Sequence, residues 1–183
     1  PVPVDADGLR VDALQATGAD AVLATPAHQS PTGAALAAQR RGALAAWARA
    51  GHLVIEDDYD AEFRYDRAPL GSLQGLAPEH VAYVGSVSKT LAPGLRLGWI
   101  VAPAPLAAPL GRLRVLADAG SPTIDQHALG FLIHRGAYDR HLLAARRAYR
   151  ARRDALLRAL ERELPGSAGA GIAAGLNALG RPP

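Results

Sequence analysis

One lysine, Lys89, lies in the stretch Ser86-Val87-Ser88-Lys89-Thr90-Leu91-Ala92-Pro93-Gly94-Leu95-Arg96-Leu97-Gly98-Trp99, and the chain has no other. Every remaining basic residue apart from the histidines is arginine, so a lysine at this position indicates chemistry that arginine cannot perform. Arginine stays protonated at any working pH, whereas a lysine amine can lose its proton and attack a carbonyl to form a Schiff base. A chance surface lysine is the alternative interpretation, and the spacing alone leaves it open.

The neighbours of Lys89 favour the chemical interpretation. A β-rich run at residues 81–84 leads into Gly85 and Ser86, and the hydroxyls of Ser86 and Ser88 precede the lysine. Arg96 follows behind a Pro-Gly turn. Hydroxyls, a lysine and a guanidinium at the carboxyl end of a strand suit a cofactor that carries both an aldehyde and a phosphate.

This stretch resembles the lysine segment of fold-type-I aminotransferases, which bind pyridoxal 5'-phosphate (PLP). The Ala-Pro-Gly-Leu-Arg spacing most resembles the MocR type of GntR-family transcriptional regulators, in which an aminotransferase-like domain follows a DNA-binding winged helix. The resemblance covers nearly the whole chain and implies an α/β fold. It implies that residues 1–136 are the C-terminal part of the PLP-binding large domain, with a partial sheet and helices. Residues 137–183 would then be a bridging helix and the start of a small C-terminal domain.

Composition restricts the class of protein. The 183 residues are 49% hydrophobic, which suits one globular domain or part of a larger one. No cysteine is present, which excludes disulfides and thiolate chemistry. The sequence has no long apolar run free of proline and no signal-like beginning, so we expect a cytoplasmic protein. The lack of methionine and the opening Pro1-Val2-Pro3-Val4 predict that the chain is a fragment.

The order of elements predicts an open α/β sheet. We expect a turn at Asp7-Gly8, a short helix from Val11, and strands at residues 21–25, 52–55, 81–84 and 97–101. A helix is predicted over residues 34–50, with Leu36 and Leu44 inward and Arg41 outward. Further helices are predicted at 105–118, 123–134 and 138–164, and a strand start at 170–173. Ligands of such sheets bind beyond the carboxyl ends of the strands.

The acidic run at residues 56–62 follows one of these strands. A solvated acidic loop, with or without a divalent cation, is one interpretation, although no calcium-loop spacing is present. The resemblance gives a sharper one. It implies that Asp57 holds the pyridine nitrogen of PLP protonated and that Tyr59 lies beside the 3-oxygen of the ring. The same resemblance makes Lys89 the residue that forms the internal aldimine. Asp58, Asp60 and Glu62 are interpreted as structural.

Two further groups complete the site that the resemblance implies. Ser86, Ser88 and Arg96 would bind the cofactor phosphate, with Arg96 as a bidentate partner, whereas turn hydroxyls and a surface arginine are the alternative. The loop 25–33 resembles the Asn-Pro-Thr-Gly loop of aminotransferases, but Ser30 stands in place of the asparagine that contacts the 3-oxygen. His28 is predicted near the cofactor, and a histidine that caps a turn is an equal alternative. No metal ligand is assigned.

Nine arginines lie between Arg135 and Arg162, and the formal net charge is +3. A basic helix can bind phosphate backbones, but acidic residues are mixed into this one and aromatic residues are few, so a solvated face is the preferred interpretation. DNA contact is expected only from an N-terminal part outside this chain. The resemblance also implies a homodimer, because fold-type-I sites lie between two subunits.

Two functions remain open. In the first, the chain is the effector domain of a PLP-dependent regulator, in which aldimine exchange with an amino compound changes DNA affinity. In the second, it belongs to a free-standing aminotransferase of the aminoadipate type that transfers an amino group to a 2-oxo acid. The Asp-Asp-Tyr-Asp-x-Glu-Phe-Arg-Tyr run and the Ala-Pro-Gly-Leu-Arg spacing favour the first. A fragment that is inactive because half its site is missing is a third possibility.

Overall fold

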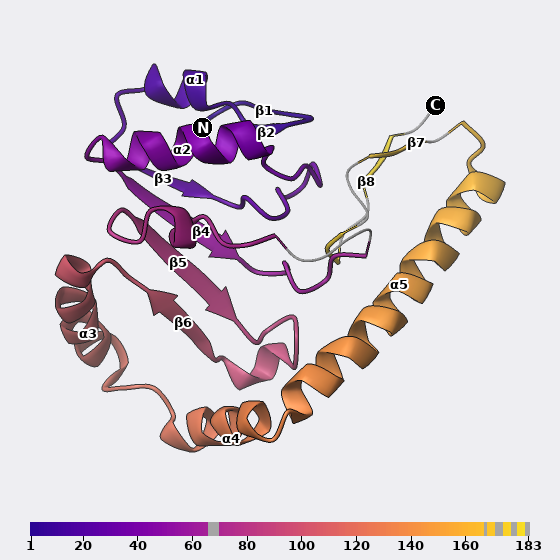
Figure 1. The fold of residues 1–183 in the computed structure, drawn as a ribbon. Coiled ribbons are helices and arrows are strands. Elements are labelled where there is room, and N and C mark those ends of the chain that lie inside the picture. Colours follow the sequence, from indigo (N-terminus) through magenta and orange to yellow (C-terminus); the bar gives the residue numbers. More distant parts are fainter. Residues whose placement is uncertain (66–69, 167, 171–173, 177–178, 182–183) are drawn as a thin grey trace.

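A four-stranded sheet lies at the centre of the computed structural model, which describes residues 1–65, 70–166, 168–170, 174–176 and 179–181. The strands lie in the order β3 (Ala21–Ala24), β4 (Leu53–Asp58), β5 (Val81–Ser86) and β6 (Gly98–Val101). β3, β4 and β5 are parallel, and β6 is antiparallel to β5. Figure 1 shows this sheet with helices around it, which confirms the α/β expectation.

The core forms where the N-terminal elements pack on one face of the sheet. The hairpin of β1 (Val4–Asp5) and β2 (Gly8–Leu9) leads into α1 (Val11–Gln15), as the Asp7-Gly8 turn predicts, and α2 (Ala38–Arg49) follows β3. Leu14, Leu44, Val54 and Val81 are almost completely buried in this core. Val22, Ala24, Val54 and Val81 occupy alternate strand positions, so their side chains project from the same face.

The predicted start of α2 is wrong by four residues. Residues 34–37 are alanine-rich, but their backbone bonds to other segments: Leu36 N–H donates to the Pro26 carbonyl and Ala37 N–H to the Asp7 carbonyl. Leu36 is buried as predicted, although it precedes the helix. Arg41 was expected outward, yet it is buried and donates to the Gly71 carbonyl, because the connection after β4 passes over this side of α2.

The second half of the chain is mostly helical. It contains α3 (Ala104–Asp118), α4 (Thr123–His134) and α5 (Ala137–Glu163), close to the predicted ranges, and short 3-10 turns lie at Gln74–Leu76 (η1) and Pro93–Leu95 (η2). No residue of α3, α4 or α5 is buried. None of the described helices is both long and apolar enough to span a bilayer.

A small antiparallel pair follows α5. β7 (Ala168–Ala170) pairs with β8 (Leu179–Arg181), and Figure 1 shows the pair between α5 and the N-terminal elements, where the chain has turned back from the end of α5. The strand predicted to start at residues 170–173 therefore overlaps β7 at its last residue, and residues 171–173 lie outside the described part of the chain.

Candidate functional site

The site residues collect at the carboxyl edge of the parallel strands. Three loops leave this edge: residues 25–33 after β3, 59–65 after β4, and 87–97 after β5. The strand register aligns Asp57 with Val84 and Asp58 with Gly85, so the acidic run ends beside the entry to the lysine loop. The parallel topology thus places the predicted groups on one edge, where ligands of open α/β sheets bind.

Asp57 differs from the other carboxylates on β4. Its side chain is half-buried and makes no hydrogen bond or ion pair with any described residue. Desolvation by burial, and then the nearby charge of Asp60, raise the pKa of Asp57. A desolvated carboxylate without a partner favours a cationic or N–H donor beside it.

The neighbours of Asp57 in sequence have protein partners. Glu56 is buried and accepts hydrogen bonds from the backbone N–H groups of Leu73 and Gln74, at 2.7 and 2.8 Å. Asp58 accepts from the Tyr83 hydroxyl at 2.8 Å, and burial raises the pKa of both Asp58 and Glu56. Glu56 therefore anchors the connection that follows β4, and Asp58 anchors the Tyr83 side chain of β5. No cluster of three or more His, Asp or Glu in the described ranges is arranged to hold a metal ion.

The lysine loop presents its charged groups outward. Lys89 and Arg96 are exposed, and neither side chain contacts a hydrogen-bond partner within the described residues. Arg96 has a left-handed backbone (φ 51°) at the end of η2. The Ser86 hydroxyl accepts a hydrogen bond from the Ser88 backbone at 3.4 Å. The eleven residues from Ser86 to Arg96 thus carry two cations together with the hydroxyls of Ser86 and Ser88 that the sequence analysis assigns to the phosphate.

Two residues at the start of α5 form hydrogen bonds with Thr90, which follows Lys89 in the chain. Thr90 is buried, its hydroxyl accepts from the Tyr138 hydroxyl at 2.9 Å, and its carbonyl accepts from Nε2 of His141 at 2.7 Å. Burial raises the pKa of Tyr138. Sequence reasoning missed this support, because the partners lie 48 and 51 residues from Thr90 and no local pattern joins them. The backbone next to Lys89 is therefore anchored to α5 through Thr90.

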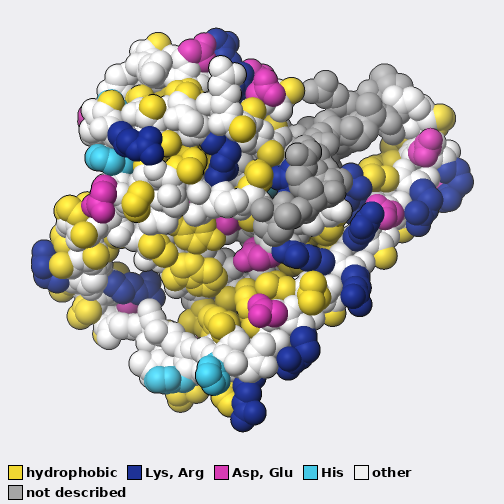
Figure 2. Space-filling view, viewed as in Figure 1, with side chains coloured by type: hydrophobic (Ala, Val, Ile, Leu, Met, Phe, Trp, Pro, Cys, Tyr) yellow, Lys and Arg dark blue, Asp and Glu magenta, His cyan; other side chains and the backbone are white. Residues whose placement is uncertain are grey.

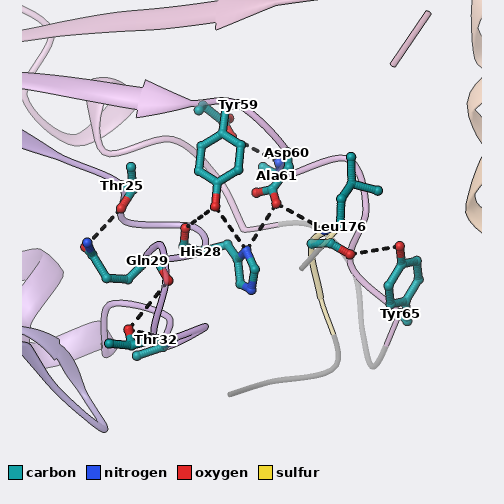
Figure 3. A network of polar contacts seen from close by, with 12 residues as sticks. Thr25, His28, Gln29, Thr32, Tyr59, Asp60, Ala61, Tyr65 and Leu176 are labelled. Carbon is teal, nitrogen blue, oxygen red and sulfur yellow. Dashed lines mark hydrogen bonds and ion pairs between the residues drawn. The ribbon is translucent and has the colours of Figure 1, made fainter. Parts of the chain in front are cut away.

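The loop after β3 meets the loop after β4 in a polar network (Figure 3). Nδ1 of His28 lies 3.1 Å from Oδ2 of Asp60, and both side chains are buried. The Tyr59 hydroxyl lies 3.2 Å from the carbonyl oxygen of His28 and 3.4 Å from its Nδ1. His28 and Tyr59, which the sequence analysis places beside the cofactor, are thus in contact with each other.

Ser30 lies apart from this contact. Its side chain is exposed and forms no hydrogen bond within the described part of the chain, while its carbonyl accepts from the Gln29 side chain at 3.1 Å. The loop is held instead by Gln29, whose backbone N–H donates to the Ala34 carbonyl and whose side chain accepts from the Thr25 hydroxyl at 2.9 Å.

The arginines of α5 are spread along its outer length, where Figure 2 shows Lys and Arg side chains following one margin of the molecule. Several have partners in the chain. Arg146 donates to the Glu62 carbonyl, and Arg153 and Arg162 pair with the adjacent Asp154 and Glu163. One arginine of α5 therefore binds the backbone of the acidic run, and two others form ion pairs within the helix.

Comparison with known proteins agrees with this geometry. The family model of aminotransferase class I and II matches residues 2–177. The chain is 42% identical over 153 residues to the HTH-type pyridoxine biosynthesis transcriptional regulator PdxR of Corynebacterium glutamicum, covering 83% of this chain and 34% of that protein. It is 33% identical over 168 residues to the probable rhizopine catabolism regulatory protein MocR of Rhizobium meliloti, covering 90% of this chain and 34% of that protein.

A solved structure of an aminotransferase also resembles this chain. LysN, an alpha-aminoadipate aminotransferase from Thermus thermophilus complexed with N-(5'-phosphopyridoxyl)-L-leucine, matches with a TM-score of 0.85 and 32% identity, over 95% of this chain and 47% of that one. The chain therefore spans about a third of the two regulators and about half of the aminotransferase. The resemblance inferred from the lysine segment is confirmed, and the chain belongs to the aminotransferase class I and II family.

Proposed function

We propose that this chain is the aminotransferase-like effector domain of a MocR-type transcriptional regulator and that it binds PLP as an imine with Lys89. One observation carries the proposal: the half-buried carboxylate of Asp57, without a protein partner in the described residues, lies at the same sheet edge as the loop of the only lysine. Burial favours an N–H donor beside Asp57, and the pyridine nitrogen of PLP supplies one when protonated.

The remaining residues fit the other groups of PLP. The Tyr59 hydroxyl lies on the loop next to Asp57 and can donate to the 3-oxygen of the ring. Ser86, Ser88 and Arg96 offer two hydroxyls and a guanidinium to the phosphate. His28 supports Tyr59, and Ser30, which is exposed, is a weaker candidate for contact with the ring. When bound, PLP supplies an aldehyde and an electron-withdrawing ring.

The relatives favour a regulator over a free-standing enzyme. The proteins named PdxR and MocR are described as regulators, at 42% and 33% identity, and the match to PdxR exceeds the 32% identity to LysN. Because LysN is complexed with a phosphopyridoxyl adduct of leucine, an amino compound is a reasonable class of effector. An aminotransferase of the aminoadipate type is the second candidate, and it rests on the high TM-score of 0.85.

Domain division and assembly are also part of this proposal. Residues 1–136 would form part of the large domain, and residues 137–183 the bridging helix and the start of the small domain, with a break at Gly136 (φ 62°). A homodimer is supported by the apolar side chains that α3 and α4 leave exposed, including Leu116 and Ile124 at 82% each. DNA would be bound by a part of the protein outside residues 1–183.

The cofactor is tested by adding PLP to the full-length protein and recording its visible absorption band. Borohydride should then fix the cofactor, and mass spectrometry should place it on Lys89, which is the only lysine among residues 1–183. Lys89→Arg is the matched control, because it keeps the charge but cannot form an imine. An adduct formed equally well in Lys89→Arg would refute the assignment.

The choice between regulator and enzyme needs a second assay. We expect the full-length protein with PLP to bind DNA upstream of its own coding region and to change its DNA affinity when an amino acid is added. Fast amino-group transfer to a 2-oxo acid, together with an absence of DNA binding, would instead favour the aminotransferase. Sequencing of the coding region before Pro1 gives an independent check, since a regulator requires a winged helix there.

A further inference from the structure

We propose that His28 and Asp60 are positioning residues that link the Tyr59 hydroxyl to residues 174–176, so that cofactor bound at Tyr59 loosens the hold on that C-terminal segment. The inference rests on the proposed function, because it requires PLP beside Tyr59. It concerns contacts within this chain, and Figure 3 shows them together: Tyr59 above the His28 ring, and Asp60 between that ring and Leu176.

The first step concerns the proton on His28. Oδ2 of Asp60 lies 3.1 Å from Nδ1 of His28 and also accepts the backbone N–H of Leu176 at 3.3 Å. One carboxylate oxygen has two lone pairs and can accept both bonds. Because an ionised carboxylate can only accept hydrogen bonds, we assign the ring hydrogen to Nδ1, which donates a hydrogen bond to Asp60. A protonated Nδ1 cannot accept from the Tyr59 hydroxyl 3.4 Å away, so that hydroxyl donates to the His28 carbonyl at 3.2 Å.

The second step concerns the C-terminal segment. Gly175 packs directly on the His28 ring: a β-carbon placed on Gly175 would lie 2.1 Å from Cε1 of His28 and 2.6 Å from Oδ2 of Asp60. The Gly175 N–H donates to the Phe63 carbonyl at 2.7 Å, and its carbonyl accepts from the Tyr65 hydroxyl at 3.0 Å. The segment is thus held by the His28–Asp60 pair and by the loop that follows Tyr59.

The third step is a competition for one proton. A phenol has a single O–H to donate. If Tyr59 donates it to the 3-oxygen of PLP, the His28 carbonyl loses its bond from Tyr59. The position of His28 is then less restrained, and the bonds that it shares with Asp60 and Leu176 weaken. Cofactor binding at the sheet edge would thereby be transmitted to the segment that follows α5.

Residue-resolved hydrogen–deuterium exchange of the full-length protein, with and without saturating PLP, tests this link. We expect PLP to speed exchange of the Gly175 and Leu176 amides about fivefold, the factor that one net hydrogen bond is worth. The amides of Leu73 and Gln74 are the internal control, because they donate to the carboxylate of Glu56 and not to the His28–Asp60 pair.

Two variants separate the link from ordinary packing. Tyr59→Phe keeps the ring and loses only the hydroxyl, so PLP should no longer change exchange at Leu176. His28→Leu removes the donor to Asp60 and should also abolish the PLP effect. His28→Asn, which retains a donor N–H near the Nδ1 position, should restore part of it. Visible absorption in the same samples confirms that each variant carries PLP, and Tyr59→Phe stays informative if His28→Leu does not fold.

The outcomes distinguish this inference from the proposed function. A cofactor-dependent increase in the unmodified protein that is lost in Tyr59→Phe supports the link. Unchanged or slower exchange at Gly175 and Leu176, in a protein that shows the PLP band, overturns the link and leaves the proposed function standing. A protein with no band and no borohydride adduct on Lys89 overturns the proposed function, and the link with it.

Discussion

The two halves of the molecule differ in where their apolar side chains lie. The half that contains β3, β4, β5 and α2 buries a continuous core, with Leu44, Val54 and Val81 completely enclosed. The half that contains β6, α3, α4 and α5 has no buried residue in any of these four elements, and Leu116 and Ile124 are each 82% exposed. The first half is therefore stabilised by a core of its own, whereas the helices of the second half enclose no side chain within the described residues.

The largest effect should come from the core of the first half. We expect Leu44→Ala in the full-length protein to lower the free energy of unfolding by about 3 kcal/mol, because it removes buried methyl groups and leaves a cavity. Urea denaturation followed by circular dichroism measures this loss. Leu116→Ala on α3 is the matched variant, and its effect should stay within about 0.5 kcal/mol in protein diluted until it is monomeric, where that face is in water.

The same two variants can also contradict the difference between the buried first half and the exposed second half. If Leu116→Ala costs as much as Leu44→Ala, then another subunit or domain covers α3 in the full-length protein. Sedimentation of both variants separates these cases, since a dimer held by α3 should dissociate in Leu116→Ala but persist in Leu44→Ala at native conditions.

The second effect concerns the point where the end of the chain returns to the first half. Gly175→Ala should lower the free energy of unfolding by about 3 kcal/mol, because a β-carbon meets the buried His28 ring and the backbone is left-handed (φ 71°). Gly18→Ala is the control, since Gly18 has a similar φ of 65° and nothing within 4 Å of an added β-carbon.

The difference between the two losses of unfolding free energy isolates the clash with the His28 ring from the backbone strain. Gly18→Ala should cost only about 1 kcal/mol, which is the backbone strain alone. Thermal denaturation of both proteins measures the gap of about 2 kcal/mol. Equal losses would show that residues 174–176 do not pack on His28 in solution.

How far the sequence predicts this molecule depends on the range of each interaction. The positions of the four central strands, the ends of α4 and the collection of Asp57 and Lys89 at one edge follow from local patterns and from the topology of parallel sheets, although β4 and β5 run two or three residues further than predicted. The start of α2 does not, because residues 34–37 bond to Gln29, Pro26 and Asp7, and these contacts outweigh the helix propensity of alanine. The contact of Asp60 with His28, 32 residues away, is set by packing, which no spacing reveals.

A smaller effect is expected where α5 touches the lysine loop. Tyr138→Phe removes the hydroxyl that donates to Thr90 and should lower the free energy of unfolding by about 1 kcal/mol. It should also weaken PLP binding, since Thr90 adjoins Lys89. Leu143→Ala, at a 53% exposed position on the same helix, should change neither quantity, and spectroscopic titration with PLP measures the affinity of both variants. An unchanged affinity in Tyr138→Phe would show that α5 does not position Lys89.

The smallest effect concerns Asp57, the carboxylate of β4 that has no partner among the described residues. Burial raises the pKa of Asp57, so the folded protein without cofactor binds a proton more tightly than the unfolded chain does. The stabilisation that comes from the protonated carboxyl is complete below the unfolded pKa and is lost as the pH rises through the folded pKa.

Asp57→Asn does not titrate, so the cofactor-free variant should gain stability relative to the unmodified protein as the pH rises from about 4 to about 8. The gain should stay below about 1 kcal/mol, because solvent screens this half-exposed group. Urea denaturation across this pH range measures it. With PLP bound the order should reverse, because only the carboxylate can hold the ring nitrogen protonated. A variant that is the less stable of the two without PLP would mean that Asp57 already has a partner in the full-length protein, and that its place beside the cofactor must be reassigned.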